Sequence, residues 1–245
     1  MTTTTTPTSP RPSGGRGAGR RAALIAGIIV AALVAAFAAV YFIFFTPDSP
    51  EELKLSPGSA QAPAGDLAGA WKVGPGSETG YRVRERLARL PAASDAVGRT
   101  SSVTGSLTVA KSGDSHVVES GGFEADLTTL KSDEDRRDNR IRTMGIETDR
   151  FPKATFNLTA PVTVPSALRE GKDATVPVTG DLTMHGFTKR VTIPVAVAAR
   201  GTTFEVVGSY TFPFSEFGME PPSIPQIGIT VEPNATMEFK LVLGR

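Results

Sequence analysis

The chain has 245 residues and carries 26 lysine and arginine residues against 25 aspartate and glutamate residues, so its net charge is close to zero. This balance argues against a nucleic-acid-binding protein, which would show a clear excess of basic residues. The chain contains no cysteine, which excludes a disulfide framework, thiol catalysis and metal sites built on cysteine. The fold must therefore be held together by its apolar core.

The first 45 residues predict a membrane anchor. Residues 1–21 are rich in threonine, proline, glycine and arginine, a composition typical of a disordered basic tail. Residues 22–45 contain no charged residue, and as a helix they would extend about 36 Å, enough to cross a hydrocarbon core of about 30 Å. All four arginines of this region precede the apolar run, and acidic residues follow it from Asp48 onward. The positive-inside rule then predicts a single-pass protein of the cell membrane, with a cytoplasmic N-terminus and an extracytoplasmic C-terminal domain.

A cleaved signal peptide is the alternative to this anchor. Ala36, Phe37 and Ala38 have the small-residue pattern of a cleavage site, but bulky apolar residues continue to Phe45, which favours an uncleaved transmembrane helix. Either interpretation exports the rest of the chain. Residues 46–69 are rich in proline, serine, glycine and alanine and predict a linker, and residues 70–245 have the size of one domain.

Alternating apolar and polar residues predict a series of half-buried strands in this domain. An opening strand lies between residues 71 and 87, and the alternation is clear over 102–109 and 155–162. Residues 176–197 form the clearest unit, a β-hairpin whose two apolar faces are separated by a turn at 185–188. Further alternating runs cover 204–214 and 237–243.

These runs predict an all-β domain of seven to nine antiparallel strands, either a closed barrel or a sandwich. An antiparallel lipocalin-like barrel of about eight strands is favoured because closure leaves no free sheet edge. One short helix is predicted after Leu130, where Ser132 and Asp135 resemble a capping box and acid–base pairs follow at helical spacing. We interpret this charged run as a solvated surface helix.

No residue pattern indicates catalysis. His116 and His185 belong to no cluster with metal-ligand spacing, and no Gly-x-Ser-x-Gly motif is present. We therefore predict no cofactor, no metal and no enzymatic activity, with an esterase triad assembled from distant residues as the less favoured alternative. His185 is expected to serve the hairpin turn, through a hydrogen bond to its own backbone. The proline-rich loop 220–226 could cap a barrel mouth or contact a partner.

Three segments, in their order and spacing, resemble the YceI-like family. The first runs from Ser132-Asp133 through Arg137-Asp138 to Phe151-Pro152-Lys153-Ala154-Thr155-Phe156. The second and most specific is Val178-Thr179-Gly180-Asp181-Leu182-Thr183-Met184-His185-Gly186-Phe187-Thr188-Lys189-Arg190-Val191-Thr192, and the third is Phe214-Ser215-Glu216-Phe217-Gly218-Met219. The resemblance covers residues 71–243.

This resemblance implies an exported bacterial protein whose lipocalin-like barrel holds a long amphiphile or polyisoprenoid in an apolar interior. Many members are soluble periplasmic proteins with a cleaved signal. The retained anchor and the basic tail predicted for this chain depart from that pattern and are a layout associated with actinobacterial members. A tethered binder is then more natural than a freely diffusing carrier.

The predicted ligand contacts are large apolar residues expected to point into the barrel, where burial of roughly 15 to 20 carbons would contribute at most about 12 to 16 kcal/mol. Core packing is the alternative role for each of them. They are Phe123, Leu127, Leu130, Met144, Ile146, Phe151, Phe156, Leu182, Met184, Ile193, Phe212, Phe214 and Phe217.

Two functions follow from these predictions. The first is a membrane-tethered protein that binds an isoprenoid or another amphiphilic lipid, contacts the membrane through one helix and binds no nucleic acid. The second is a non-enzymatic interaction module of the cell envelope, with a solid barrel and loops that bind another protein. The sequence leaves open whether the protein is a monomer or a homodimer.

Overall fold

The computed structural model describes residues 27–38, 49–58, 60–88 and 93–245, and the chain divides into two units, 1–47 and 48–245. In the first unit, the described residues 27–38 are helical. The prediction of a transmembrane helix over 22–45 is wrong for the part of the chain that the structure describes, because no helix in it is both long and apolar enough to span a bilayer. The rest of that run and the predicted tail, 1–21, lie outside the described residues.

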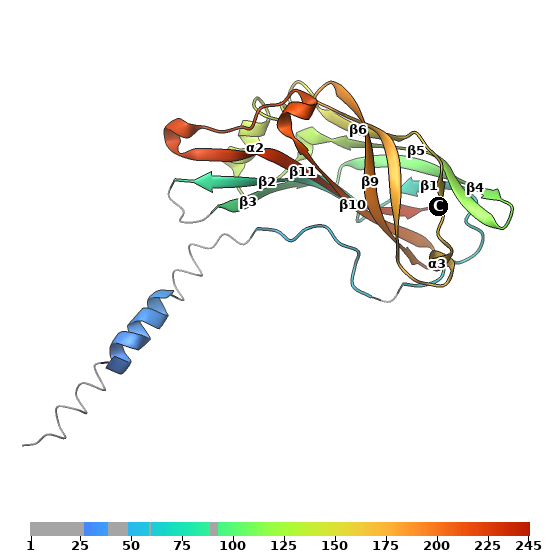
Figure 1. Cartoon of the computed structure of the whole chain (residues 1–245), viewed down its shortest axis with the longest axis horizontal. Coiled ribbons are helices and arrows are strands. Elements are labelled where there is room, and N and C mark those ends of the chain that lie inside the picture. Colours follow the sequence, from blue (N-terminus) through green and yellow to red (C-terminus); the bar gives the residue numbers. More distant parts are fainter. Residues whose placement is uncertain (1–26, 39–48, 59, 89–92) are drawn as a thin grey trace, which may run out of the picture. The chain divides into compact units, whose positions relative to one another are not determined.

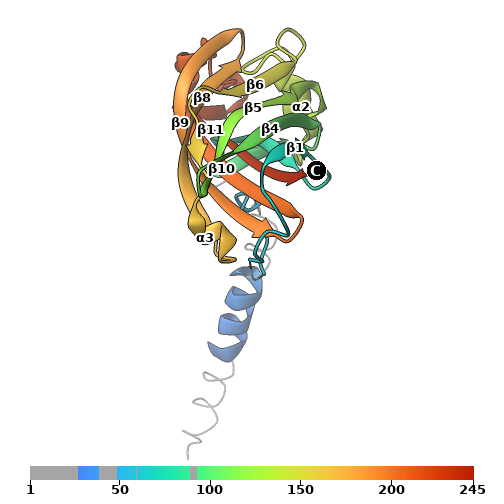
Figure 2. The same ribbon diagram turned by 90° about the vertical axis from the view of Figure 1, so that its right-hand side faces the viewer.

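The second unit is a closed antiparallel barrel, as the alternating sequence predicts (Figure 2). Eight strands follow one another around it, and the last returns to the first because β11 pairs with both β10 and β1. In spatial order they are β1 (Gly69–Val73), β4 (Val103–Ser112), β5 (Ser115–Asp126), β6 (Lys153–Leu158), β8 (Ala174–Met184), β9 (Phe187–Arg200), β10 (Thr203–Pro213) and β11 (Ile229–Gly244).

Three more strands belong to the same sheet without completing the ring. β2 (Glu78–Leu87) pairs with the first part of β11, and β3 (Ser94–Thr100) pairs with β2, so that both extend from the barrel (Figure 1). The short β7 (Val162–Thr163) pairs only with β5. The 3-10 turns are η1 (Leu127–Thr129), η2 (Phe214–Phe217) and η3 (Pro225–Ile227).

The predicted helix is confirmed as α2 (Asp135–Ile141), but the predicted capping box is not formed. Glu134 is the N-cap residue, and its side chain accepts a hydrogen bond from the backbone N–H of Arg136. Ser132 instead donates from its backbone N and its Oγ to Oδ1 of the buried Asp138, at 2.9 and 2.7 Å. The second helix, α3 (Ser166–Arg169), is a single turn that lies well apart from α2 in both views (Figures 1 and 2).

A pair of prolines determines where hydrogen bonding between neighbouring strands stops. Pro177 on β8 lies directly opposite Pro194 on β9. Because neither residue has a backbone N–H, the two cannot form a hydrogen-bonded pair, and each directs its remaining carbonyl to the other edge of its strand. The β9–β10 ladder accordingly ends at Val195, one residue after Pro194.

One end of the barrel is filled by its own side chains. η2 contacts β9, β10 and β11, and it contributes Phe214 and Phe217 to a buried cluster with Phe212 and Met219. Phe217 is completely buried, and its ring meets that of Phe212 edge-on at 5.0 Å between centroids. We refer to this region as the packed end.

His185 occupies the β8–β9 turn, as predicted, but with a different hydrogen bond. Its backbone has a φ of 50°, a left-handed conformation typical of tight turns. Its ring does not bond its own backbone: Nδ1 donates to the carbonyl oxygen of Phe217 at 3.1 Å. The imidazole therefore ties the hairpin to η2 at the packed end.

The described part of the segment that the composition predicts as a linker lies along the barrel. The Ser56 N–H donates to Oε2 of Glu205 at 2.9 Å. Further on, the N–H groups of Gln61 and Ala64 donate to the carbonyl oxygens of Ala199 and Gly201, at 3.0 and 2.9 Å. We call residues 60–68 the strap.

Candidate ligand-binding cavity

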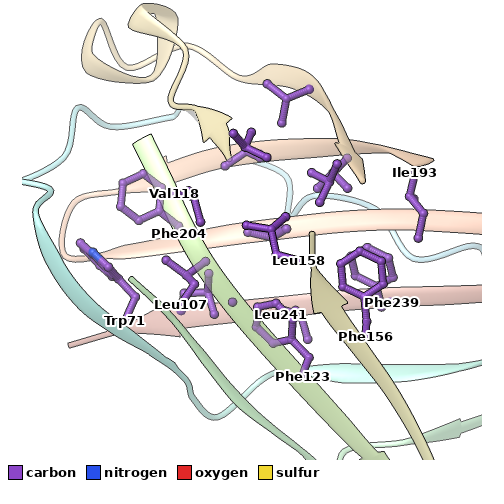
Figure 3. A pocket seen from close by; sticks show the side chains of 18 of the residues that line it. Trp71, Leu107, Val118, Phe123, Phe156, Leu158, Ile193, Phe204, Phe239 and Leu241 are labelled. Carbon is purple, nitrogen blue, oxygen red and sulfur yellow. The ribbon is translucent and has the colours of Figure 1, made fainter. Parts of the chain in front are cut away.

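The barrel contains a cavity of about 210 Å³ beyond the packed end, and this cavity is partly open to its surroundings. Its wall is almost entirely apolar and is built from all eight barrel strands together with residues of the strap, β2, β7 and α3. The lining runs from Trp71 and Phe204 at one end to Phe156 and Ile193 at the other (Figure 3). The alternative of a barrel filled throughout by its own side chains is therefore not supported.

Alternation along β8 and β9 explains much of this lining. Val178 and Leu182 on β8, and Ile193, Val195 and Val197 on β9, point inward at a period of two. On the outer face, β8 carries the polar Thr179 and Asp181, and β9 carries Pro194 and Ala196; Oγ1 of Thr179 and Oγ1 of Thr192 lie 2.9 Å apart there. The strands thus bury one apolar face without burying unpaired polar groups.

Two aromatic rings of the lining lie against glycines of neighbouring strands. A Cβ atom on Gly180 would come within 2.2 Å of the Phe156 ring, and one on Gly208 within 2.6 Å of the Phe239 ring. Any larger residue at either position would therefore push its ring into the cavity. These glycines let the rings lie close to the wall and leave the centre of the barrel open.

The structure brings together only part of the predicted ligand contacts. Phe123, Phe156, Leu182 and Ile193 line the cavity. Leu127, Leu130 and Ile146 pack in a separate cluster with Ile141 of α2, and Met184, Phe212, Phe214 and Phe217 belong to the packed end. Phe151 lies against the His185 ring at 4.1 Å between centroids, and Met144 is 39% exposed.

Several lining residues were absent from that prediction. The alternating pattern places Phe204, Leu241 and Leu243 at inward positions, but the predicted contacts do not include them. Trp71 begins the opening strand and is not among the predicted contacts either. Leu67 and Leu168 lie outside regular strands, in the strap and α3, where no periodic pattern could identify them.

The strap closes the end of the cavity opposite the packed end. Leu67 and Trp71 are each 5% exposed, and Leu168 of α3 is 2% exposed. The indole Nε1 of Trp71 donates to the Leu67 carbonyl oxygen at 2.9 Å, and the Trp71 ring meets that of Phe204 edge-on at 4.9 Å. These three buried side chains therefore seal the barrel where the strap passes.

A polar cluster fastens the strap to its surroundings. His116 of β5 lies between Asp66 of the strap and Arg169 of α3. Because an arginine can only donate, Nδ1 of His116 accepts from Arg169, and Nε2 carries the proton that it donates to Oδ1 of Asp66 at 2.7 Å. We call these three residues the latch.

Lowering the pH is expected to loosen the latch. The hydrogen bond from His116 holds the pKa of the Asp66 carboxyl below its ordinary value of 3.8. A carboxyl with a lower pKa in the folded state contributes stability above its unfolded pKa and loses it as the pH falls through the folded pKa. Amide hydrogen exchange in the strap, corrected for intrinsic rates, should therefore accelerate relative to β9 below about pH 4.

The Asp66→Asn variant is the control for this effect, because its side chain cannot be ionised. Its strap should exchange faster than that of the wild type at neutral pH and should show no further relative change as the pH falls. Equal protection of the strap in the two proteins across this range would contradict the role assigned to the latch.

The polar groups of the cavity wall are few. Thr79, Thr155, Thr163 and Glu124 border the cavity, and Glu124 is paired with Lys153 at 2.7 Å. His116 and His185 both lie outside the lining. Such a wall offers an apolar chain a favourable environment and gives water few hydrogen-bonding partners.

Comparisons with known proteins agree with this architecture. Residues 71–243 match the sequence profile of the YceI-like domain. No curated protein matches the chain. Among solved structures, a polyisoprenoid binding domain from Saccharophagus degradans, implicated in plant cell wall breakdown, is 16% identical, with 72% of this chain and 98% of that chain covered at a TM-score of 0.55.

Two further structures are similar at lower TM-scores. BcnA of Burkholderia cenocepacia is 18% identical, with 67% of this chain and 95% of that chain covered at a TM-score of 0.47. The YceI protein of Campylobacter jejuni is 10% identical, with 57% and 80% covered at a TM-score of 0.41. At these identities the likeness concerns the fold, whereas the sequence profile covers most of the chain. The chain belongs to the YceI-like family.

Proposed function

We propose that the barrel binds the hydrocarbon chain of an isoprenoid or a similar amphiphile, without covalent chemistry. The observation that carries this proposal is the apolar cavity between the packed end and the strap. The polyisoprenoid-binding domain from Saccharophagus degradans, which has the same fold, also supports it. Burial of a CH₂ group in such a cavity contributes about 0.8 kcal/mol before the cost of ordering the chain is subtracted.

The size of the cavity limits how much of a chain it holds. An engineered apolar cavity of about 150 Å³ accommodates benzene. In proportion, the cavity of about 210 Å³ accommodates about eight carbon atoms, between one and two isoprene units. This is about half of the 15 to 20 carbons expected from the sequence, so a long isoprenoid would have only part of its chain inside.

Affinity for a series of isoprenyl alcohols should therefore rise with chain length and then level off. We expect at least a tenfold gain between one and two isoprene units, since each further buried CH₂ adds up to about 0.8 kcal/mol. Beyond that length additional units would lie outside the cavity and add little. Isothermal titration calorimetry with purified full-length protein measures the series, with short-chain diols of equal carbon number as a polar control.

Two results would contradict this proposal in different ways. Failure to bind any member of the series would argue against chain binding altogether. A steady gain in affinity over many isoprene units would instead show that the cavity enlarges far beyond the volume described here.

We further propose that the barrel acts outside the cytoplasm. The uncharged run 22–45, preceded by arginines as the only charged residues, supports targeting across a membrane. Protease added to intact spheroplasts should then degrade the barrel domain while a cytoplasmic marker survives. Survival of the domain until the cells are lysed would contradict this localisation.

A further inference from the structure

One junction between neighbouring strands of the barrel is not closed by backbone hydrogen bonds. The β6–β8 ladder ends where Leu158 faces Gly180, followed by a last hydrogen bond from the Thr159 N–H to the Thr179 carbonyl oxygen at 3.1 Å. Beyond this point β7 lies beside β8 but pairs only with β5. From 174 to 178, a stretch that the structure describes in full, β8 has no backbone partner on this edge. We call this junction the seam.

Pro177 lies at the seam and helps to keep it unpaired. Pro177 has the same parity on β8 as Thr179, whose carbonyl oxygen points toward β6. The backbone of Pro177 therefore faces the seam, where its missing N–H removes one of the donors that a ladder with β7 would need. This placement is typical of proline in a sheet, which is tolerated at an unpaired strand edge.

The side chains on both sides of the seam belong to the cavity wall. Leu158, Val162 and Val164 line the cavity from β6 and the β7 segment, and Val176 and Val178 line it from β8. Separation of β7 from β8 would therefore expose the cavity directly. It would break contacts between apolar side chains but no backbone ladder, and an incoming hydrocarbon chain would replace those contacts.

The ends of the barrel are closed more firmly than the seam. The packed end is filled by buried aromatic side chains around Phe217. At the other end, access would require Leu67 and Leu168 to leave buried positions and the latch to break. The hydrogen bonds of Gln61 to β9 and of Ala64 to the β9–β10 turn would break as well. Leu67, Leu168 and His116 are buried, whereas the lining residues on both sides of the seam are only partly buried, so opening the seam displaces fewer buried groups.

We propose that the amphiphile enters the cavity laterally, through the seam between β7 and β8, and that the part of a long chain that the cavity cannot hold leaves through the same seam. This inference rests on the proposed function, since it concerns access to the same cavity. It explains how a barrel that is closed at both ends can bind a chain longer than its cavity.

Reversible cross-linking tests the inference. Because the chain contains no cysteine, the reagent can react only with the cysteines that are introduced. If the β6–β8 register continued, Thr163 would lie opposite Thr175, so the double variant T163C/T175C places a thiol on each side of the seam. The folded full-length protein is joined with a short bis-maleimide that contains a reducible disulfide. Uptake of parinaric acid, a fluorescent polyene fatty acid, is followed by stopped-flow fluorescence before cross-linking, after it, and after reduction of the linker.

Three controls use the same probe. T163C/T175C capped with N-ethylmaleimide carries the bulk of the reagent without the link. T179C/T192C joins β8 to its hydrogen-bonded neighbour β9 and does not span the seam. D66C/H116C, linked by the same reagent, fastens the strap to β5 and thereby locks the closed end.

We expect the linked seam to take up the probe at least tenfold more slowly than the capped protein and to recover on reduction, while the other two linked variants keep their rates. Unchanged uptake by cross-linked T163C/T175C would overturn the inference. If only cross-linked D66C/H116C took up the probe slowly, the chain would enter at the end of the barrel that the strap closes. In both cases the wild type still binds the probe, so the proposed function stands. A wild type that never binds the probe would contradict the proposed function itself, and the inference with it.

Discussion

Replacing Val206 by tryptophan is expected to abolish chain binding while leaving the barrel folded. Val206 lies on β10 near the middle of the cavity wall, where it packs against both the packed end and the cluster around Trp71. An indole at this position would occupy much of the space available to a chain. Loss of room for about four CH₂ groups corresponds to about 3 kcal/mol, or a weakening of at least a hundredfold. Filling a cavity is generally neutral or favourable for stability, so the melting temperature should change little.

Ser209→Trp is the matched control, because Ser209 lies on the same strand with its side chain exposed. Calorimetric titration with a two-unit isoprenyl alcohol should show wild-type affinity for this variant and none measurable for Val206→Trp. Retained affinity in a folded Val206→Trp protein would mean that the chain binds somewhere other than this cavity.

The second large effect is expected on stability, from Phe217→Ala. Phe217 has no exposed surface, and its ring packs against Phe212 at the packed end. Truncation of a buried phenylalanine removes its burial free energy and leaves a void in a close-packed region, at a cost of about 3 to 5 kcal/mol in the free energy of unfolding. Because Phe217 lies outside the cavity lining, affinity for a short isoprenyl alcohol should stay within about threefold of the wild type wherever the protein is folded.

Phe239→Ala provides the contrast, since the Phe239 ring borders the cavity. Its removal should cost less stability than that of Phe217, because the ring already faces open space, and it should lower affinity. Urea unfolding and calorimetric titration measure the two quantities. A Phe217→Ala protein that unfolds like the wild type but binds weakly would restore Phe217 as a ligand contact.

The barrel could be predicted from the sequence because alternation reports directly which side chains point inward. The β8–β9 hairpin, with its apolar face from Val178 to Leu182 and from Val191 to Val197, forms in the structure with its turn at His185. Alternation does not indicate how far along the barrel axis an inward-pointing side chain lies. Phe156 and Phe212 have equivalent inward parity on their strands, yet one lines the cavity and the other fills the packed end.

Other parts of the site carried weaker signals. The strap has the composition of a linker. Its place in the domain becomes evident from the structure, in which Leu67 is buried. Pro177 and Pro194 did carry a usable signal, since proline inside an alternating run marks an unpaired strand edge. The transmembrane prediction for 22–45 depended on the length and apolar composition of the run, whereas no helix in the described part of the chain is long and apolar enough to span a bilayer.

The pairing of β1 with β11 joins the first strand of the domain to the last. Contacts between residues so distant in the sequence form slowly, because a long stretch of chain must be ordered before they can be made. During synthesis, β1 therefore has no partner on its β11 side until the C-terminal residues have emerged. Until then, the incomplete barrel exposes its apolar inner face to solvent. Only the last residues of the chain complete β11 and allow the sheet to close.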